Sequence, residues 1–167
     1  LIDEDSSFLQ FIKIISESTN INYEITIVEG WQKYQLDQYL KLFYSNFKLD
    51  YYDLIADTYI LKSDSSFDDL IQLSNLNKNK LFKNYNNNNL SKKFLIKDIF
   101  IISSLVEKEA FGNKDKKLIS SVIFNRLEKK MKLQIDATVI YSITNGKYNL
   151  QRKLNYKDLK INHPFNT

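Results

Sequence analysis

The sequence predicts an α+β fold in which helices dominate the second half of the chain. Residues 23–28 alternate between polar and apolar types, as a half-buried strand does. After residue 97, two long segments carry apolar residues at helical spacing. Hydrophobic residues make up 43% of the 167-residue chain and aromatic residues 14%, so the chain can bury a core and is not a disordered polypeptide.

In the first half we expect helices and strands to follow one another. The expected elements are a helix over residues 8–15, capped by residues 5–7; a strand over 23–28, ended by Gly30; a helix over 35–47; a short strand within 51–61; and a helix that begins at Phe67 behind a cap in residues 63–66. Residues 84–89 hold five Asn in six positions, which predicts a loop that serves as a subdomain hinge or a surface insertion.

In the second half the pattern is mostly helical. The expected elements are helices over residues 97–111 and 115–130, an extended or mixed segment over 133–141, a turn at Asn145-Gly146, and a short helix over 154–159. No internal repeat is apparent in the sequence.

The side chains available for chemistry are restricted. The chain has no Cys and a single His, His163, which excludes disulfides, thiolate nucleophiles, zinc–thiolate sites and His-cluster metal sites. We expect no metal and no cofactor. Any catalysis has to come mainly from carboxylates, hydroxyls, amides and lysines.

The net charge of +4 raises the question of a nucleic-acid partner. Of the 24 basic residues, only Arg126 and Arg152 are Arg, the residue that reads bases most often. The lysines alternate with acids or lie in Asn-rich stretches. We therefore expect no nucleic-acid partner and keep a basic nucleic-acid-binding domain as the least favoured alternative.

Glu109 occupies an unusual position on the helix expected over residues 97–111. At about 100° per residue, Ile102, Leu105 and Val106 fall within about 60° of it, so Glu109 lies near the centre of the apolar stripe, while Glu107 points away. Burial would favour the protonated form, which a general acid acting on a glycosidic bond needs. The alternative is that the helix frays after Val106 and leaves Glu109 solvated.

Three polar residues alternate with apolar ones in the segment expected to be extended. Gln134, Asp136 and Thr138 would then share one face, which suits a ligand rich in hydroxyls and amides. An ordinary edge strand has the same pattern, and both interpretations stay open.

Two further residues are candidates for a cleft. Asn125 would point into it while its neighbour Arg126 pairs with an acid, although an exposed pair near a helix end fits equally well. Tyr141 would be a platform for sugar stacking or a packing residue.

Three ordered motifs resemble the YceG-like (MltG-type) endolytic murein transglycosylases. They are S-S-L-V-E-K-E-A at 103–110, V-I-F-N-R-L at 122–127 and M-K-L-Q-I-D-A-T-V-I-Y at 131–141. Weaker matches are V-E-G-W at 28–31, D-T-Y at 57–59 and F-N-T at 165–167.

The resemblance implies an enzyme of the bacterial inner membrane, held by one N-terminal anchor helix, with its catalytic domain on the periplasmic or extracellular side. Such enzymes cleave the bond between N-acetylmuramic acid and N-acetylglucosamine inside nascent peptidoglycan strands and leave 1,6-anhydro ends. The partners implied are glycan strands and cell-wall synthases.

By motif position, the resemblance assigns the acid/base role to Glu109, the second glutamate of E-K-E. One carboxylate suffices because the muramyl 6-hydroxyl, in place of water, attacks the anomeric carbon. The residues expected to line the glycan cleft are Asn125, Gln134, Asp136, Thr138, Tyr141 and Asn166.

The resemblance also divides the chain. Residues 1–31 are expected to be the remnant of a small LysM-like α/β domain with its linker strand, and residues 32–167 a helix-rich transglycosylase domain whose motif core is 97–167. The family continues beyond the position of Thr167, so this domain is expected to be truncated at its C-terminus. Ala56 and Ala137 stand where the family has Pro. The alternative function is a catalytically impaired relative that binds glycan or acts as a scaffold in cell-wall synthesis.

Overall fold

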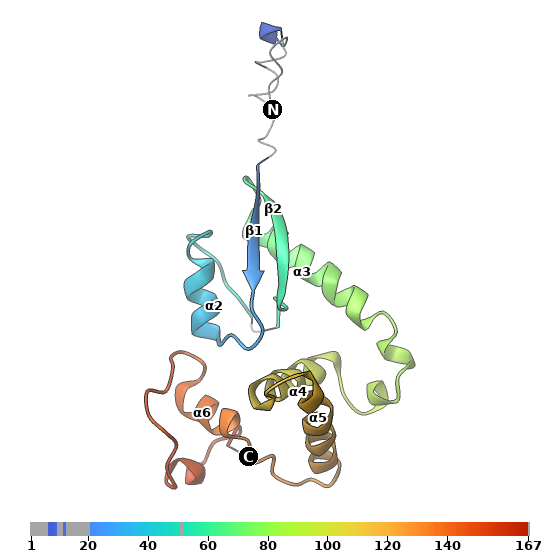
Figure 1. Ribbon diagram of the computed structural model, residues 1–167, viewed down its shortest axis with the longest axis vertical. Helices are drawn as coiled ribbons and strands as arrows, with labels where there is room; N and C mark the ends of the chain where they lie inside the picture. The colour runs from blue at the N-terminus through green and yellow to red at the C-terminus, as the bar shows by residue number, and fades with distance from the viewer. Residues whose placement is uncertain (1–6, 10–11, 13–20, 51, 167) are drawn as a thin grey trace.

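The computed structural model describes residues 7–9, 12, 21–50 and 52–166. A two-stranded sheet with helices α2 and α3 forms one end of this region, and helices α4, α5 and α6 form the other (Figure 1). The elements are β1 (Asn22–Ile27), α2 (Lys33–Leu40), β2 (Asp57–Lys62), α3 (Phe67–Phe82), α4 (Ile96–Glu109), α5 (Asn113–Glu128) and α6 (Asp136–Thr144), with the 3-10 turns η1 (Tyr85–Asn87), η2 (Asn89–Lys92) and η3 (Asp158–Lys160). The predicted α+β class is confirmed.

The sheet pairs β1 with β2 in antiparallel register, with Ile25 opposite Tyr59. Ile25, Ile27, Tyr59 and Leu61 are buried, which confirms the alternation predicted for residues 23–28. This pairing crosses the predicted domain boundary between residues 31 and 32. The boundary and the LysM-like remnant stay predictions.

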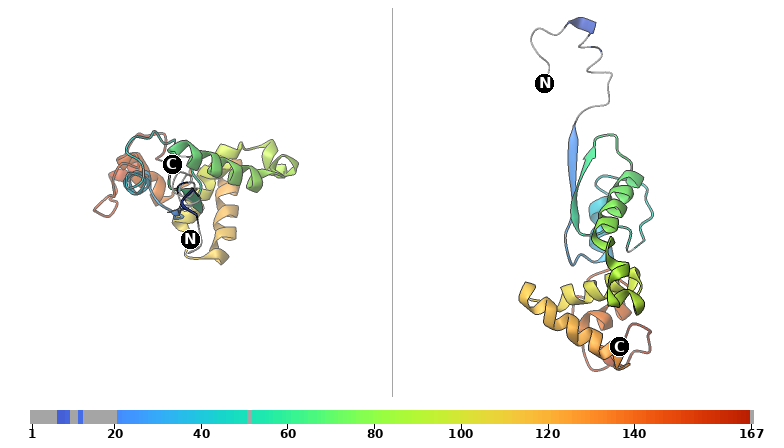
Figure 2. Two further views of the ribbon diagram at one scale, coloured as in Figure 1. Left: turned by 90° about the horizontal axis from the view of Figure 1, so that it is seen from above. Right: turned by 90° about the vertical axis from the view of Figure 1, so that its right-hand side faces the viewer.

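The first hydrophobic core lies where α2 and α3 pack against the sheet, as the side view in Figure 2 shows. Its buried members are Ile25, Ile27, Leu40, Tyr44, Leu49, Leu54, Ile55, Tyr59, Leu61 and Leu70. Ser74 on α3 is buried among them, and its hydroxyl donates to the carbonyl of Asp53 at 2.8 Å and accepts the N–H of Ile55 at 3.2 Å. These bonds attach the chain before β2 to α3.

The cap predicted before Phe67 is confirmed. Ser66 accepts the backbone N–H of Asp69, and the Asp69 carboxylate accepts the N–H of Ser66 at 2.7 Å. This reciprocal pair satisfies two backbone donors that a helix otherwise leaves free at its first turn.

The second hydrophobic core joins the last helices. Ile102 and Val106 of α4 pack with Ile123 of α5 and Ile135, which precedes α6. Phe100, also on α4, packs against the first core instead. Helix α4 therefore contributes to both cores.

One predicted element in the first half differs from the structure, and one cannot be compared with it. The helix expected over residues 35–47 ends at Leu40, because the rings that follow it pack from a turn: Phe43 stacks on Tyr23 at 5.7 Å and Phe47 lies 5.0 Å from Phe67. Tertiary contacts override the helical spacing there. The helix expected over residues 8–15, with its cap, lies largely outside the described residues.

Three other predictions are confirmed: the short strand within residues 51–61, the helices over 97–111 and 115–130 to within a few residues at their ends, and the turn at Asn145-Gly146. Residues 84–89 lie in the η1–η2 connection, and their role as a hinge stays a prediction. In the part of the chain that the structure describes, no helix has the length and apolar character of a membrane span.

Leu70 and Leu76 on α3 provide a test of the first core. Leu70 is 0% exposed and Leu76 is 56% exposed. Leu70→Ala is expected to lower the free energy of unfolding by about 2–5 kcal/mol, because it leaves a cavity, whereas Leu76→Ala should change it by about 0.5 kcal/mol or less. Urea unfolding followed by circular dichroism measures both, and equal losses would contradict this account of the core.

Candidate functional site

The two glutamates at the end of α4 differ in burial, in the opposite sense to the prediction. Glu109 is exposed, whereas Glu107 is half-buried. The apolar stripe ends one turn earlier, at Val106, because the second core does not reach the last turn of α4. Glu109 is the final residue of the helix, and Ala110 is already extended. The expectation that Glu109 is drawn out of water is therefore wrong, and solvation, the alternative left open, is what the structure has.

Glu107 holds the last turn of α4 in place. Its carboxylate pairs with Lys116 of α5 at 2.7 Å. Gly30, in the turn between β1 and α2, is also near it: a Cβ atom there would be 3.7 Å from the Cγ of Glu107. Gly30 has a φ of 76°, which glycine adopts without strain. The turn, α4 and α5 thus meet at Glu107.

The second motif lies on α5. Asn125 is exposed there, as its candidate role requires. The guanidinium of Arg126 does not pair with an acid as predicted but donates to the backbone carbonyl of Leu133. The N–H of Met131 donates to the carbonyl of Arg126 at 2.8 Å. These two bonds fold the chain sharply between α5 and the third motif.

The third motif is helical from Asp136 onward. The prediction that Gln134, Asp136 and Thr138 share one face of an extended segment is therefore wrong. Val139 packs in the interior and the N–H of Thr138 donates to the carbonyl of Ile135, which starts α6 at this point. Gln134, with a φ of 53°, and Asp136 are exposed. Thr138 is 9% exposed, and its hydroxyl donates to the carbonyl of Ile135 at 2.7 Å.

Tyr141 and the C-terminal segment form an aromatic cluster. The ring of Tyr141 meets Phe165 edge to face at 5.2 Å, and His163 lies 5.3 Å from Phe165. Gly146 approaches the same tyrosine so closely that a Cβ atom would lie 3.2 Å from its ring. Tyr141 is therefore half-buried by these packing contacts.

Asp158, which sequence reasoning missed, organises the loop that carries Asn166. Its buried carboxylate accepts two bonds from Arg152, at 2.6 and 2.8 Å, and the N–H of Asn155 at 2.7 Å. The hydrogen bonds from Arg152 are the largest cause that lowers the pKa of Asp158, to about 2. The amide of Asn166 donates to the carbonyls of Asp158, at 3.0 Å, and Ile161, at 2.8 Å.

This network also corrects the short helix expected over residues 154–159. Only the 3-10 turn η3 forms, because the Asp158 carboxylate accepts the Asn155 N–H and the Asn155 side chain accepts the N–H groups of Lys157 and Asp158. The available sequence signal was Arg152, one of two Arg in the chain, six residues before an Asp.

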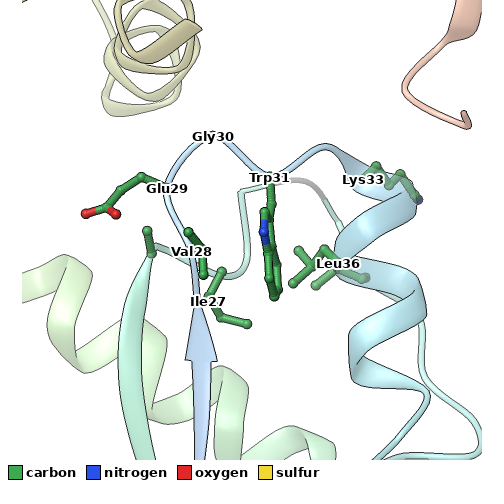
Figure 3. Close-up of a pocket in the computed structure, with 9 residues that line it drawn as sticks. Ile27, Val28, Glu29, Gly30, Trp31, Lys33 and Leu36 are labelled. Atoms are coloured by element: carbon green, nitrogen blue, oxygen red, sulfur yellow. The ribbon is translucent and has the colours of Figure 1, made fainter. Parts of the chain in front are cut away.

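The turn between β1 and α2 lies between two parts of the candidate site. Near Gly30 it contacts Glu107 and Lys108 of α4. A few residues later the N–H of Tyr34 donates to the carbonyl of Gly146, after α6, at 3.2 Å. The close-up in Figure 3 shows this turn and the cavity of about 120 Å³ beside it.

The candidate residues do not form one closed cavity. Glu109, Asn125, Gln134 and Asp136 are exposed on three neighbouring elements, whereas Tyr141 and Asn166 belong to the loop cluster beyond α6. A second cavity, of about 500 Å³, lies between the segment after α2 and the start of α3. Neither cavity includes these six residues. Among the described residues, no group of three His, Asp or Glu side chains is placed to hold a metal ion.

The chain has a helix-rich α+β fold, and a solved structure shares it. A putative yceG-like protein from Listeria monocytogenes superposes with a TM-score of 0.67 at 25% identity, over 94% of this chain and 63% of that one. The model of the YceG-like family matches residues 1–167. The chain belongs to the YceG-like family, and the resemblance found in the three motifs is confirmed.

Two curated relatives carry the name endolytic murein transglycosylase. The one from Bacillus subtilis (strain 168) is 28% identical over 191 residues, which cover 93% of this chain and 52% of the relative. The one from Streptococcus pneumoniae (strain D39) is 32% identical over 98 residues, which cover 59% of this chain and 18% of the relative. The chain thus spans about half the length of the Bacillus protein that it matches.

The Asp158 network predicts a pH dependence of stability. Because the pKa of Asp158 is lowered from 3.8 to about 2 in the folded chain, its stabilising contribution is complete above the unfolded value of 3.8 and is lost as the pH falls towards 2. Asp158→Asn should therefore be less stable than the parent chain at pH 7, and the difference should narrow between pH 4 and pH 2. Urea unfolding at pH 7, 4 and 2 measures it.

Asp64, an exposed residue in the turn before α3, provides the matched control. Asp64→Asn should follow the parent chain at every pH. A gap between Asp158→Asn and the parent that is as wide at pH 2 as at pH 7 would contradict the role assigned to the Arg152–Asp158 pair.

Proposed function

We propose that this chain is the glycan-cleaving part of a peptidoglycan lytic transglycosylase, with Glu109 as its acid/base carboxylate. Membership of the YceG-like family and the names of the relatives support the reaction class. The observation that carries the assignment is the position of Glu109, an exposed carboxylate at the end of α4 with the two other motif elements beside it.

The reaction needs only one carboxylate. Glu109 donates its proton to the oxygen that leaves as the bond between N-acetylmuramic acid and N-acetylglucosamine breaks. The resulting carboxylate then takes the proton of the muramyl 6-hydroxyl, whose oxygen bonds to the anomeric carbon and closes the 1,6-anhydro ring. No water is consumed, so the second carboxylate that activates water or attacks the sugar in hydrolysing glycosidases is not required.

Glu109 fits this role better than Glu107. The Glu107 carboxylate is already paired with Lys116 and is half-buried against the Gly30 turn, whereas that of Glu109 is open to a ligand. A sugar ring lying on Glu109 would exclude water from it, and exclusion of water favours the neutral form of a carboxyl group, as a general acid requires.

The remaining candidates divide by exposure. The exposed Asn125, Gln134 and Asp136 are free to hydrogen bond with hydroxyl and acetamido groups of the strand. Half-buried Tyr141 and Asn166 would border the cleft at the loop cluster. Thr138 is buried, and its hydroxyl is bonded to the carbonyl of Ile135. Its contribution to glycan binding would therefore be indirect, by holding the first turn of α6 in place.

The cellular setting follows from the resemblance. The protein would be held in the bacterial inner membrane by one N-terminal helix, with the catalytic domain on the periplasmic or extracellular side. It would cut nascent strands beside the cell-wall synthases, with which it would associate.

One observation favours a second function, a catalytically impaired relative that binds glycan or acts as a scaffold. Glu109 is exposed and lies outside both cavities, so no enclosed site surrounds it. Such a relative would bind strands and release no product.

Glu109→Gln separates these functions. In the full-length natural protein this change should lower the release of anhydro-ended fragments from purified glycan strands by about 10²–10⁴-fold, the usual share of general acid–base catalysis. Liquid chromatography with mass spectrometry counts the products. Glu24→Gln, which removes an exposed carboxylate on β1, should leave the rate unchanged.

Two outcomes would reject the proposal. Undiminished product release by Glu109→Gln would remove Glu109 from the reaction. A parent protein that binds strands and releases no anhydro ends would establish the scaffold function instead.

A further inference from the structure

The last turn of α4 carries charges that its own helix does not favour. Glu107 and Glu109 lie at the C-terminal end of α4, where the helix dipole disfavours negative charge. The buried residues of the second core end at Val106, and Ala110 is already extended, so apolar packing does not hold this turn. Helix ends of this kind fray unless contacts from outside the helix hold them.

Lys116 is also placed against the preference of its own helix. It is the fourth residue of α5, near the N-terminal end, where the helix dipole disfavours positive charge. Its ammonium lies 2.7 Å from the Glu107 carboxylate, so two charges that are each unfavourable in their own helix compensate each other across the α4–α5 connection. Positions that break local preferences in this way are expected at functional sites.

The turn between β1 and α2 packs beside this pair. A Cβ atom at Gly30 would be 3.7 Å from the Cγ of Glu107 and 3.9 Å from the Nζ of Lys108. Gly30 has a φ of 76°, so the turn approaches α4 at a position that suits glycine. The last turn of α4 therefore has contacts from α5 and from the sheet end of the molecule.

We infer that Glu107 and Lys116 form a positioning pair, whose ion pair fixes the last turn of α4 and thereby sets the place of the Glu109 carboxylate on the bound strand. The inference rests on the proposed function. Glu109 follows Glu107 by two residues, about 3 Å of helical rise, so a shift of this turn moves Glu109 with it. A displacement of about 1 Å at a reacting group can cost about 10²-fold in rate.

Removal of either partner tests the pair. In the full-length natural protein, Glu107→Gln and Lys116→Gln should each lower kcat for the release of anhydro-ended fragments by about tenfold or more and leave KM unchanged, because the acid/base group is misplaced while the strand still binds. The double variant should lose no more than either single variant, because each residue acts through the other. Lys116→Arg keeps the cation and should keep the parent kcat.

Glu128 provides the matched control. It also belongs to α5 and pairs with Lys93, but it follows Lys116 by 12 residues, about 18 Å along the helix. Glu128→Gln should keep the parent kcat. All these variants should unfold near the parent's midpoint, because partly exposed ion pairs add little to global stability.

Four results would overturn the positioning pair. They are a parent-like kcat in either single variant, a raised KM in place of a lowered kcat, a loss in the double variant that equals the product of the two single losses, and a loss in Glu128→Gln as large as that in Glu107→Gln.

Hydrogen exchange followed by mass spectrometry separates this inference from the proposed reaction. Peptides that cover residues 107–110 should exchange faster in Glu107→Gln and Lys116→Gln than in the parent, because the last turn opens more often. Full activity in Glu109→Gln would reject the reaction assigned to Glu109 and leave this exchange result standing. An inactive Glu109→Gln together with a parent-like kcat in Glu107→Gln would reject the positioning pair alone.

Discussion

The arrangement of this chain depends on the packing of α4 into two hydrophobic cores. Phe100 contacts the core built on the β1–β2 sheet, while Ile102 and Val106 belong to the core shared with α5 and the segment before α6. Because interiors are close-packed, a helix fixed on two sides has little freedom to rotate or shift. The last turn of α4, which follows Val106, therefore has a fixed position although its residues belong to neither core.

Beyond Val106 the local contacts decide what each glutamate does. Glu107 is held between Lys116 and the Gly30 turn, and Glu109, two residues later, meets solvent. A carboxylate that is open to a polymer and carried by a rigid helix suits a reaction in which the substrate completes the site. The turn at Gly30 also lies against Glu107 and Lys108, so the sheet end of the molecule packs beside the last turn of α4.

Much of the fold could be predicted because its local signals agree with the tertiary structure. The Ser66 cap, the alternation in β1 and the spacing in α4 and α5 all depend on neighbours in sequence. The predictions that are wrong depended on distant partners. Phe43 lies outside the helix that its spacing predicted, because its ring stacks on Tyr23. Residues 136–144 form a helix because Val139 packs in the interior.

By itself the sequence determined the α+β class, the order of most elements and, through three motifs, the YceG-like family. The first motif also singled out Glu109 as the candidate acid/base residue. Only the tertiary structure decided that Glu109 is exposed, that Asp158 organises the last loop and that the Gly30 turn lies against α4. Helical spacing shows which residues share a face, whereas burial depends on how far the packing partner extends along that face. On α4 the buried residues of the second core end at Val106, so Glu109 is exposed although it shares the apolar face.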